Sequence, residues 1–416
     1  MKTDLDQLLH ENDLDALLII GNGQNNPPMV YMTGGAHLSD AYLIKKKNQL
    51  PILYHHMMER DEAQKSGLET RNIEMIDLNR MMRSNPSQGS LQHQRAVALI
   101  QNILEDLDLS SGKVAIYGQY ETGKGYAMFS ALQTALPELT LVGETENPVL
   151  WSAMLTKDED EIERIKKMGL ITTEVVAEIA DLLSRSKVSG NILKKKDDTP
   201  LTIGSIRRQI NLLLAERGVE NPHGTIFSMG RDAAVPHNVG NDQQEIELGK
   251  TIVFDIYPCE AGGGYFYDFT RTWSLGYATD ETYRVYEEVR KVYHLVTEAL
   301  ESSKPFKDYQ ELACDIFEAR GFATIRKTPG LQSGYVHQIG HGLGLNIHEP
   351  PSSRSISSKL DFLFPGTVFT IEPGLYFPDD EIGVRLEDTF YVKKNGQIKK
   401  IVDYPLDLIL PVGQRS

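Results

Sequence analysis

Cysteine is scarce in this sequence, because the 416 residues contain only two, Cys259 and Cys314. Two cysteines far apart in the chain argue against a disulfide scaffold and fit a reducing cytosol. Long apolar runs are also lacking, so no stretch is expected to span a bilayer. The amino terminus, MKTDLDQLLHENDLD, is acidic and has no apolar signal core. These absences predict a soluble, cytoplasmic protein with no membrane partner.

Positive charge is in the minority. Lysine and arginine number 43 against 58 acidic residues, which gives a net charge of −15. Such a charge disfavours a nucleic acid or an anionic membrane as a partner. The length is enough for two or three domains, each with a core of its own.

The stretch Thr251–Leu275 organises the rest of the chain. The apolar run Ile252–Phe254 ends in Asp255, a glycine-rich turn follows at 262–264, and the chain returns through aromatic residues to Asp268. This pattern predicts a β-hairpin with one carboxylate on each strand. Taken alone, the stretch leaves two interpretations open: the acids meet at a cation, or they are strand-end aspartates in solvent.

A second stretch repeats the pattern and favours the cation. The segment LGKTIVFD ends at Asp255 and FPGTVFTIE ends at Glu372, and each has a glycine six residues before its acid. A second acid follows each segment, Asp268 in the first case and Glu387 in the second. Repetition of this unit predicts two acid-bearing hairpins that supply four carboxylates to a shared core. Buried carboxylates are costly unless they are paired or bind metal.

Three histidines lie between the two units, in VHQIGHGLGLNIHEPP: His337, His341 and His348. Imidazole is a common metal ligand. Four carboxylates with one or two histidines make an oxygen-rich site, which favours Mn²⁺, although Zn²⁺, Co²⁺ and Fe²⁺ also bind such ligands. Four carboxylates exceed the charge of one divalent ion, which suggests two ions.

Four motifs in this order, YDFTRT, HQIGHGLGLNIHE, TIEPGLY and VRLED, resemble those of the M24 metallopeptidases, the aminopeptidase P and prolidase group. The likeness covers the chain from about Thr156 to the end, and a less specific likeness covers the rest. It implies a creatinase/prolidase-like α/β domain over residues 1–155 and an α+β catalytic domain with the pita-bread fold over residues 156–416.

Alternation of strand and helix patterns supports an α/β class for the first 150 residues. Leu14–Ile20 and Lys113–Gly118 read as strands, and a hairpin is expected around Lys45–Asn48. Gly118–Gly125, GQYETGKG, is nearly a phosphate-binding loop, but its last position lacks the hydroxyl that holds Mg²⁺. We therefore expect an ordinary strand-to-helix connection there. The polar stretch 80–92 is expected to be a loop.

In the second domain the pattern runs helix, hairpin, helices, hairpin, which is α+β in character. Thr156 and Glu159 are expected to form a capping box at the start of a long amphipathic helix. A break is expected near Gly169. The polar, basic segment 186–199 is expected to be an exposed connection.

The resemblance also implies roles for individual residues. Asp255 would chelate one ion, His341 and Glu372 the other, and Asp268 and Glu387 would bridge the two. Glu372 would also take the proton from the nucleophilic water.

Further residues would surround the metals by the same resemblance. His237 would contact substrate near the scissile bond, and His348 would stabilise the intermediate or shuttle a proton. Arg385 would orient Glu387 or hold a substrate carboxylate. Tyr376 would add a hydrogen bond, and His337 would line a proline pocket.

The sequence departs from many family members at Tyr257, where a glycine is usual, and in a slightly long loop between the first two acids. Both features bear on substrate preference. The function that the resemblance implies is hydrolysis of Xaa-Pro bonds at the amino terminus of short peptides by a homodimeric enzyme.

Alternatives stay open at this stage. The chain length favours an Xaa-Pro dipeptidase or aminopeptidase over a methionine aminopeptidase, which usually lacks a large amino-terminal domain. Retention of all the carboxylates argues against a creatinase-like hydrolase and against a non-catalytic binding protein on the same fold. The motifs do not distinguish a dipeptide from a longer peptide as the substrate.

Overall fold

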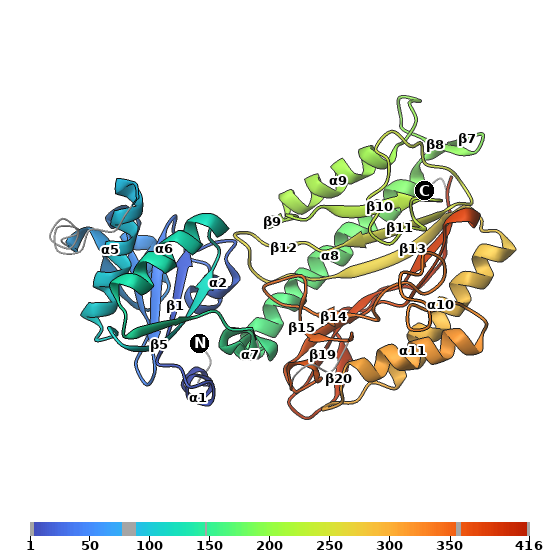
Figure 1. Cartoon of the computed structure of the whole chain (residues 1–416). Helices are drawn as coiled ribbons and strands as arrows, with labels where there is room; N and C mark the ends of the chain where they lie inside the picture. Colours follow the sequence, from blue (N-terminus) through green and yellow to red (C-terminus); the bar gives the residue numbers. More distant parts are fainter. Residues whose placement is uncertain (1–3, 77–88, 146–147, 355–358, 414–416) are drawn as a thin grey trace. The chain divides into compact units, whose positions relative to one another are not determined.

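The computed structural model describes residues 4–76, 89–145, 148–354 and 359–413, arranged as two compact units. The first unit comprises residues 1–154 with the short segment 262–264, and the second comprises the remainder (Figure 1). Among the described residues, no helix has the length and apolar character needed to cross a membrane. The predicted loop at 80–92 lies largely outside the described residues, and a helix already begins at Leu91.

The first unit is built on a mixed six-stranded sheet in the order β4-β3-β2-β1-β5-β6. Its strands are β1 (Ala16–Gly21), β2 (Ala41–Lys46), β3 (Ile52–His55), β4 (Glu69–Asn72), β5 (Gly112–Gly118) and β6 (Leu139–Val142). The predicted hairpin joins β2 to β3 in antiparallel register, whereas β1 and β5 pair in parallel. A parallel neighbour is the arrangement that strand–helix alternation predicts.

Helices cover both faces of this sheet. They are α1 (Leu5–Glu11), α2 (Pro27–Thr33), α3 (Arg60–Lys65), α5 (Leu91–Asp106), α6 (Thr122–Ala135) and α7 (Val149–Leu155). Side chains of β1 alternate between two cores: Leu18 and Ile20 pack with α5 and α6, and Leu17 and Ile19 pack with α1, α2 and α7. Because successive strand residues point to opposite faces, a strand buried on both sides is apolar throughout.

The near-match to a phosphate-binding loop is a strand-to-helix turn, as expected. Glu121 caps α6, and its carboxylate accepts hydrogen bonds from the backbone N–H groups of Gly123 and Lys124 at 3.0 and 2.7 Å. A carboxylate therefore occupies the position where a phosphate would bind a helix N-terminus.

The second unit contains a four-stranded sheet, β10-β11-β13-β21, and a five-stranded sheet, β15-β14-β16-β19-β20, with three two-stranded pairs. Its strands are β7 (Lys187–Ser189), β8 (Ile192–Lys194), β9 (Val219–Glu220), β10 (Thr225–Met229), β11 (Thr251–Ile256), β12 (Cys259–Glu260), β13 (Phe269–Leu275), β14 (His341–Gly342), β15 (Glu349–Ser352), β16 (Val368–Ile371), β17 (Gly374–Phe377), β18 (Ile382–Arg385), β19 (Asp388–Val392), β20 (Ile398–Lys400) and β21 (Ile409–Leu410). Both predicted acid-bearing strand pairs form, because β11 pairs with β13 and β16 pairs with β19, each in antiparallel register.

Two helices precede each acid-bearing strand pair along the chain, so the unit consists of two related halves (Figure 1). These helices are α8 (Glu159–Arg185), α9 (Ile203–Glu216), α10 (Asp280–Glu298) and α11 (Lys307–Ala319). The apolar faces of α10 and α11 share one core with β16 to β19. A β-bridge between Thr270 and Glu387 joins the two strand pairs directly.

Three local predictions differ from the structure. The capping box at the start of α8 is formed by Asp158 and Glu161, not by Thr156 and Glu159, so the helix begins later than expected. Helix α8 runs unbroken through Gly169. A Cβ at Gly169 would lie 2.7 Å from the Tyr267 ring, so glycine is required for close packing rather than for a kink.

The third difference is the connection after α8. The segment predicted as a plain polar connection contains the β7–β8 hairpin, with Lys187 opposite Lys194 and Ser189 opposite Ile192. Each of these three-residue strands has a lysine at one end, which hid the strand pattern because lysine is depleted in strands.

Candidate metal centre

Three of the predicted ligands converge at the junction of the two halves. One side-chain ligand atom from each of Asp268, His341 and Glu387 lies within 4.8 Å of the other two. Asp268 directly precedes β13, His341 begins β14, and Glu387 directly precedes β19. Because the Thr270–Glu387 bridge fixes the register between these strands, the carboxylates meet although more than a hundred residues separate them.

The other two predicted ligands border this cluster. Glu372 follows β16, and its Oε1 lies 3.7 Å from His341 Nε2, while Asp268 Oδ2 lies 3.4 Å from the same nitrogen. Asp255 is in β11, and its pKa is affected by the charge of Asp268. The backbone carbonyl of Gly342 contacts His341 Nδ1 at 3.0 Å, which directs Nε2 toward the acids.

Burial and mutual repulsion perturb the protonation of these groups. Burial raises the pKa of Asp255 to about 6 and that of Glu372 to about 7, and it raises the pKa of Glu387 well above its ordinary value. Burial opposes protonation of His341, but the hydrogen bond to Asp268 and the charges of Glu372 and Asp268 outweigh it and raise the pKa to about 9. Carboxylates packed this closely cannot all ionise unless positive charge joins them.

Two buried oxygens of the carboxylate cluster have no hydrogen-bond partner among the described residues, Asp255 Oδ1 and Asp268 Oδ1. A buried, unsatisfied carboxylate oxygen is costly, and a divalent cation would satisfy it. Oxygen donors with a single imidazole are typical ligands for such ions. The residues present therefore fit a divalent metal site.

The Arg385 side chain contacts four residues beside the cluster, one of which is Thr270, whose Oγ1 accepts from Nε at 3.4 Å. Its Nη2 donates to Asp255 Oδ2 at 2.6 Å, its Nη1 donates to the Tyr376 hydroxyl at 2.7 Å, and both nitrogens lie 3.3 Å from the Pro236 carbonyl oxygen.

Arg385 is 2% exposed. Its direct carboxylate partner is Asp255, because β18 runs beside β11 in this unit. Thr270 links Arg385 to Glu387, since it accepts from Arg385 and donates to Glu387 at 2.7 Å. Orientation of Glu387 or binding of a substrate carboxylate by Arg385 stays a prediction.

Tyr376 is fully buried, and its hydroxyl is shared between Arg385 and His337. The Tyr376 hydroxyl lies 2.9 Å from His337 Nε2, and His337 Nδ1 lies 2.7 Å from the Gln338 carbonyl oxygen. Burial and the charge of Arg385 lower the pKa of His337 to about 3, so this ring is neutral.

The remaining two histidines lie at the surface of the site. His348 is exposed, and its ring centroid lies 4.3 Å from that of His341. Desolvation and the charge of His341 lower the pKa of His348 to about 4. His237 is exposed in the loop after β10, and surrounding protein atoms together with the charge of Arg385 lower its pKa.

The position that departs from the family pattern, Tyr257, directly follows β11 and is half-buried. Burial raises its pKa, and the charges of Asp255 and Asp268 raise it further, so the phenol lies within electrostatic range of the carboxylate cluster. Its effect on substrate preference stays a prediction.

Sequence reasoning missed an ion pair that supports the histidine loop. Lys157 Nζ lies 2.8 Å from Glu349 Oε2, and each side chain is 1% exposed. The other Glu349 oxygen accepts the backbone N–H of Asn346 at 2.9 Å. Because Glu349 directly follows His348, this pair fixes the loop that carries His341 and His348. Its only sequence signal was the HE pair in the motif.

A second missed network lies behind Glu387. Arg271 is buried and donates to Asp388 Oδ1 at 2.9 Å and to the Glu387 carbonyl oxygen at 2.8 Å. The other Asp388 oxygen contacts the Tyr293 hydroxyl and, at 3.2 Å, Lys400 Nζ. The network fixes the backbone on either side of Glu387. Its signal in the sequence is the arginine of TRT and the two adjacent acids of LED.

The fold and the site together are those of a metal-binding protein. Two related halves present four carboxylates and one histidine to one buried site, and this arrangement is suited to divalent cations. The family model of metallopeptidase family M24 matches residues 163–394, and the chain belongs to this family. The family predicted from the motifs is thus confirmed.

Relatives in this family resemble the chain at moderate identity. It is 28% identical to the Xaa-Pro dipeptidase of Pyrococcus furiosus over 249 residues, which are 60% of this chain and 63% of that enzyme. The Xaa-Pro dipeptidase of Pyrococcus horikoshii is 26% identical over 408 residues, which are 97% of both chains.

Solved structures show the same fold over nearly the whole length. The prolidase of Pyrococcus horikoshii superimposes with a TM-score of 0.70 at 22% identity, over 98% of this chain and 99% of that chain. The X-Pro aminopeptidase of Thermotoga maritima gives a TM-score of 0.72 at 22% identity, over 97% and 98%. The predicted architecture, an α/β domain followed by a pita-bread domain, is confirmed.

Proposed function

We propose that this protein is a metal-dependent exopeptidase that hydrolyses Xaa-Pro bonds at the amino terminus of short peptides. The observation that carries the proposal is the buried cluster of carboxylates around His341, with two oxygens unpartnered, in a chain of the M24 family. The names of the relatives, Xaa-Pro dipeptidase and X-Pro aminopeptidase, support the substrate class.

Two divalent ions, most readily Mn²⁺, are proposed for this centre. Asp255, Asp268, His341, Glu372 and Glu387 would hold them, and the orphaned oxygens of the two aspartates support this set. When bound, such ions lower the pKa of water and polarise a carbonyl. The oxygen-rich donor set favours Mn²⁺, and Zn²⁺, Co²⁺ and Fe²⁺ fit the same donors.

Side chains around the ions would move and hold protons. Glu372 would accept the proton of the attacking water and return it to the leaving amine. The pKa of His348 is lowered to about 4, so its ring is neutral at about pH 7 and would donate a ring N–H to the developing oxyanion. Arg385 would keep one oxygen of Asp255 engaged and leave Oδ1 directed at the ions.

Recognition of proline would rest on shape, because an Xaa-Pro amide has no N–H to bind. His237 is exposed beside Arg385 and would contact the substrate near the scissile bond. His337 would line the proline pocket, and Tyr376 would hold its ring through the hydroxyl contact of 2.9 Å. Because Tyr376 is fully buried, we propose that it orients the His337 ring and does not contact the substrate directly.

A homodimer and a cytoplasmic location are proposed as well. Both cysteines are free and buried, which is typical of a reducing compartment.

Peptide hydrolysis with added Mn²⁺ tests the proposed substrate class. The substrates are Ala-Pro, Ala-Pro-Ala and Met-Ala-Ser, because they separate a dipeptidase, an aminopeptidase P and a methionine aminopeptidase. We expect turnover of one or both proline peptides and none of Met-Ala-Ser. Turnover of Met-Ala-Ser alone would contradict the proline assignment.

The variant Asp268→Asn tests the centre. We expect loss of peptide hydrolysis, because the amide removes one ligand charge from the cluster. Asp403→Asn is the matched control, since its side chain is 97% exposed and contributes nothing to the centre. Equal activity of the two variants would contradict the role of Asp268.

A further inference from the structure

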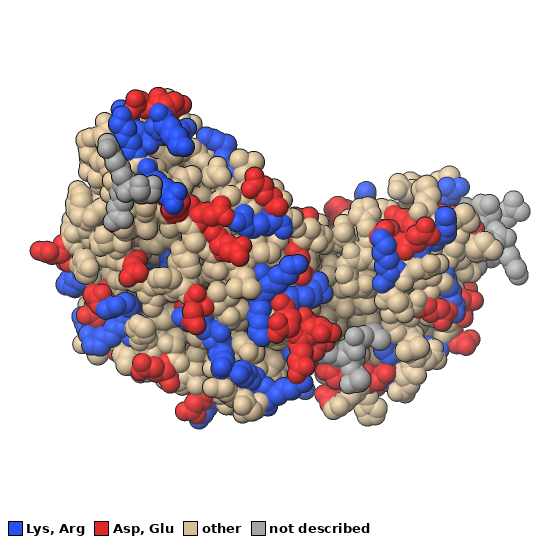
Figure 2. Space-filling model, turned by 180° about the vertical axis from the view of Figure 1, so that it is seen from behind, with Lys and Arg blue, Asp and Glu red and all other residues tan. Residues whose placement is uncertain are grey.

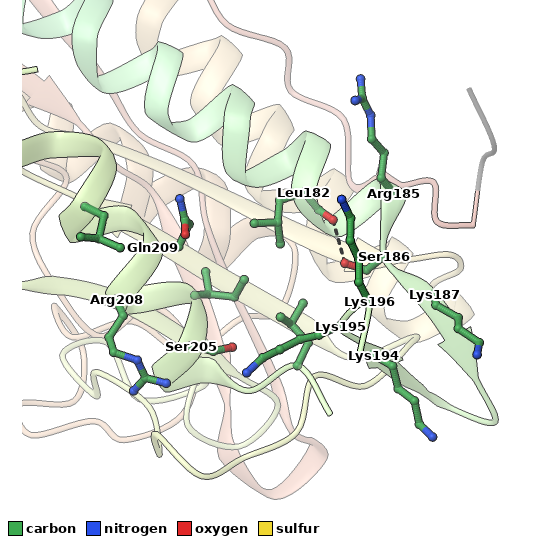
Figure 3. A pocket seen from close by; sticks show the side chains of 13 residues that line it. Leu182, Arg185, Ser186, Lys187, Lys194, Lys195, Lys196, Ser205, Arg208 and Gln209 are labelled. Carbon is green, nitrogen blue, oxygen red and sulfur yellow. Dashed lines mark hydrogen bonds between the residues drawn. The ribbon is translucent and has the colours of Figure 1, made fainter. Parts of the chain in front are cut away.

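A pocket of about 700 Å³ lies apart from the metal centre, between the end of α8, the β7–β8 hairpin and the first turns of α9 (Figure 3). None of its lining residues is a proposed metal ligand or contacts one through a hydrogen bond given above. Its volume falls in the range of about 300–1,000 Å³ that is typical of small-molecule sites.

The rim of the pocket is rich in cations. Among its basic residues, Lys187 pairs with Asp198 and Arg185 pairs with Asp181, at 2.5 and 2.8 Å. In Figure 3, Lys187 and Lys194 point away from the pocket, and Lys195 extends across it toward Ser205.

Four rim cations have no ion-pair partner within the described ranges of the chain: Lys194, which points away from the pocket, and Lys195, Lys196 and Arg208, on which the site depends. Lys195 and Lys196 come from the segment after β8, and Arg208 lies across from them on α9 (Figure 3). An anion in the pocket would be attracted to these cations, although Lys195 also lies within electrostatic range of the exposed Asp197.

The floor of the same pocket is apolar. It is formed by Leu182 of α8, Leu201, and Ile206 and Leu212 of α9. Leu212 is 58% exposed, so this large apolar side chain is open to a ligand in the pocket. Apolar surface under unpaired cations is a combination that suits one molecule with both an apolar body and an anionic group.

The surroundings make this concentration of positive charge stand out. The whole chain carries a net charge of −15. On the face shown in Figure 2, basic side chains gather at the upper left end of the larger unit with acidic side chains at its tip, and basic and acidic side chains alternate over much of the remaining surface. A cleft lined by basic side chains raises the local concentration of anions.

We propose that this pocket binds a small amphipathic anion, a molecule with an apolar or aromatic body and one carboxylate, sulfonate or phosphate group. The apolar body lies on Leu182, Ile206 and Leu212, and the anionic group is bound by Lys195, Lys196 and Arg208. This site is independent of the peptidase reaction and uses none of its residues.

Fluorescence titration of the metal-loaded, full-length protein tests the proposal. The probe is anilinonaphthalene sulfonate, an amphipathic anion that is a poor metal ligand, and N-phenylnaphthylamine is its uncharged counterpart. We expect saturable binding of the sulfonate at one site per chain. The uncharged dye is expected to bind at least about tenfold more weakly, because hydrogen bonds to charged groups are the stronger kind.

The variant K195Q/K196Q/R208Q should weaken binding of the sulfonate by about tenfold or more. R95Q/K124Q/K291Q is the matched control, because it removes the same charge from exposed residues outside the pocket and should change binding less than about twofold. Leu212→Ser tests the floor and should weaken both dyes. Unchanged melting temperatures and unchanged peptide hydrolysis establish that the variants are folded.

Three results would overturn the proposal: equal binding of the two dyes, equal effects of the two triple variants, or no effect of Leu212→Ser. Two further arms identify the source of the anion. Displacement of the dye by decanoate, but not by acetate, supports a free small molecule. Lysine-dependent co-sedimentation with phosphatidylglycerol vesicles would mean that the pocket meets a lipid surface, and the small-molecule proposal would be wrong.

Discussion

Removal of the Lys157 charge by Lys157→Met is predicted to destabilise the catalytic unit and to slow hydrolysis. Its ammonium lies 2.8 Å from Glu349 Oε2, and both side chains are 1% exposed. The substitution leaves Glu349 charged, buried and supported only by the neutral donors of Asn346. Breaking such a pair typically costs about 3–5 kcal/mol. Because His348 is the preceding residue, we also expect kcat to fall by about 10- to 100-fold.

A double-mutant cycle measures this interaction. The variant K157M/E349Q removes both charges, and its glutamine oxygen still accepts the Asn346 N–H. We expect the double variant to be less destabilised than the sum of the two single variants, with an interaction energy of about 1–3 kcal/mol.

Urea unfolding followed by tryptophan fluorescence is the assay for this cycle. The chain has two tryptophans, and Trp273 lies in β13 of the catalytic unit. A Trp151→Phe background makes the signal specific to that unit. A cost below about 0.5 kcal/mol for Lys157→Met, as at an ordinary surface position, would refute the reasoning. Strictly additive single variants would refute it as well.

Three further predictions concern the centre and its support. Arg385→Lys should lower Mn²⁺ affinity or kcat/KM by about 10- to 100-fold, because lysine cannot hold Asp255 and Tyr376 together; calorimetry and kinetics that match wild type would contradict this. Asp388→Asn should cost about 3–5 kcal/mol in urea unfolding, since it breaks a buried pair; a cost near zero would show that the network is not stabilising. Burial raises the pKa of Asp255 to about 6 and that of Glu372 to about 7. Between about pH 4 and about pH 7 the metal-free folded state therefore keeps protons that the unfolded state has lost. The stability that these two protons contribute is lost as the pH rises through that range. Mn²⁺ replaces those protons, so the increase in melting temperature on adding Mn²⁺ should grow between about pH 5 and 8; an increase that is constant with pH would contradict the assignment.

The strand pairs were predictable because their acids follow β-branched runs of fixed length. Asp255 and Glu372 each end such a run, and both strands form where expected. The predicted start of α8 is too early because Thr156 and Asp158 are both good capping residues. In the structure Thr156 forms a β-bridge with Thr367 and the Lys157 N–H donates to the Gly366 carbonyl oxygen, which keeps both residues out of the helix. Local helix propensity cannot predict such tertiary contacts.

The residue types of the centre were predictable from motifs, whereas their partners were not. The motif that contains Arg385 does not indicate its ion pair with Asp255, which lies 130 residues away in the sequence. Lys157 and Glu349 are 192 residues apart, and neither stands out in its own segment. Such pairings depend on how the strands and helices pack, and a single sequence gives the ligands of a site more readily than the residues that hold them.

The number of metal ions that activity requires tests the central claim most directly. Metal-free enzyme, at a concentration well above the dissociation constant, is titrated with Mn²⁺ while hydrolysis of an Xaa-Pro peptide is followed. We predict that activity rises until two equivalents have been added per chain and then remains constant. Full activity without added metal, in protein shown by elemental analysis to contain none, would contradict the claim that this carboxylate cluster works as a dinuclear metal centre.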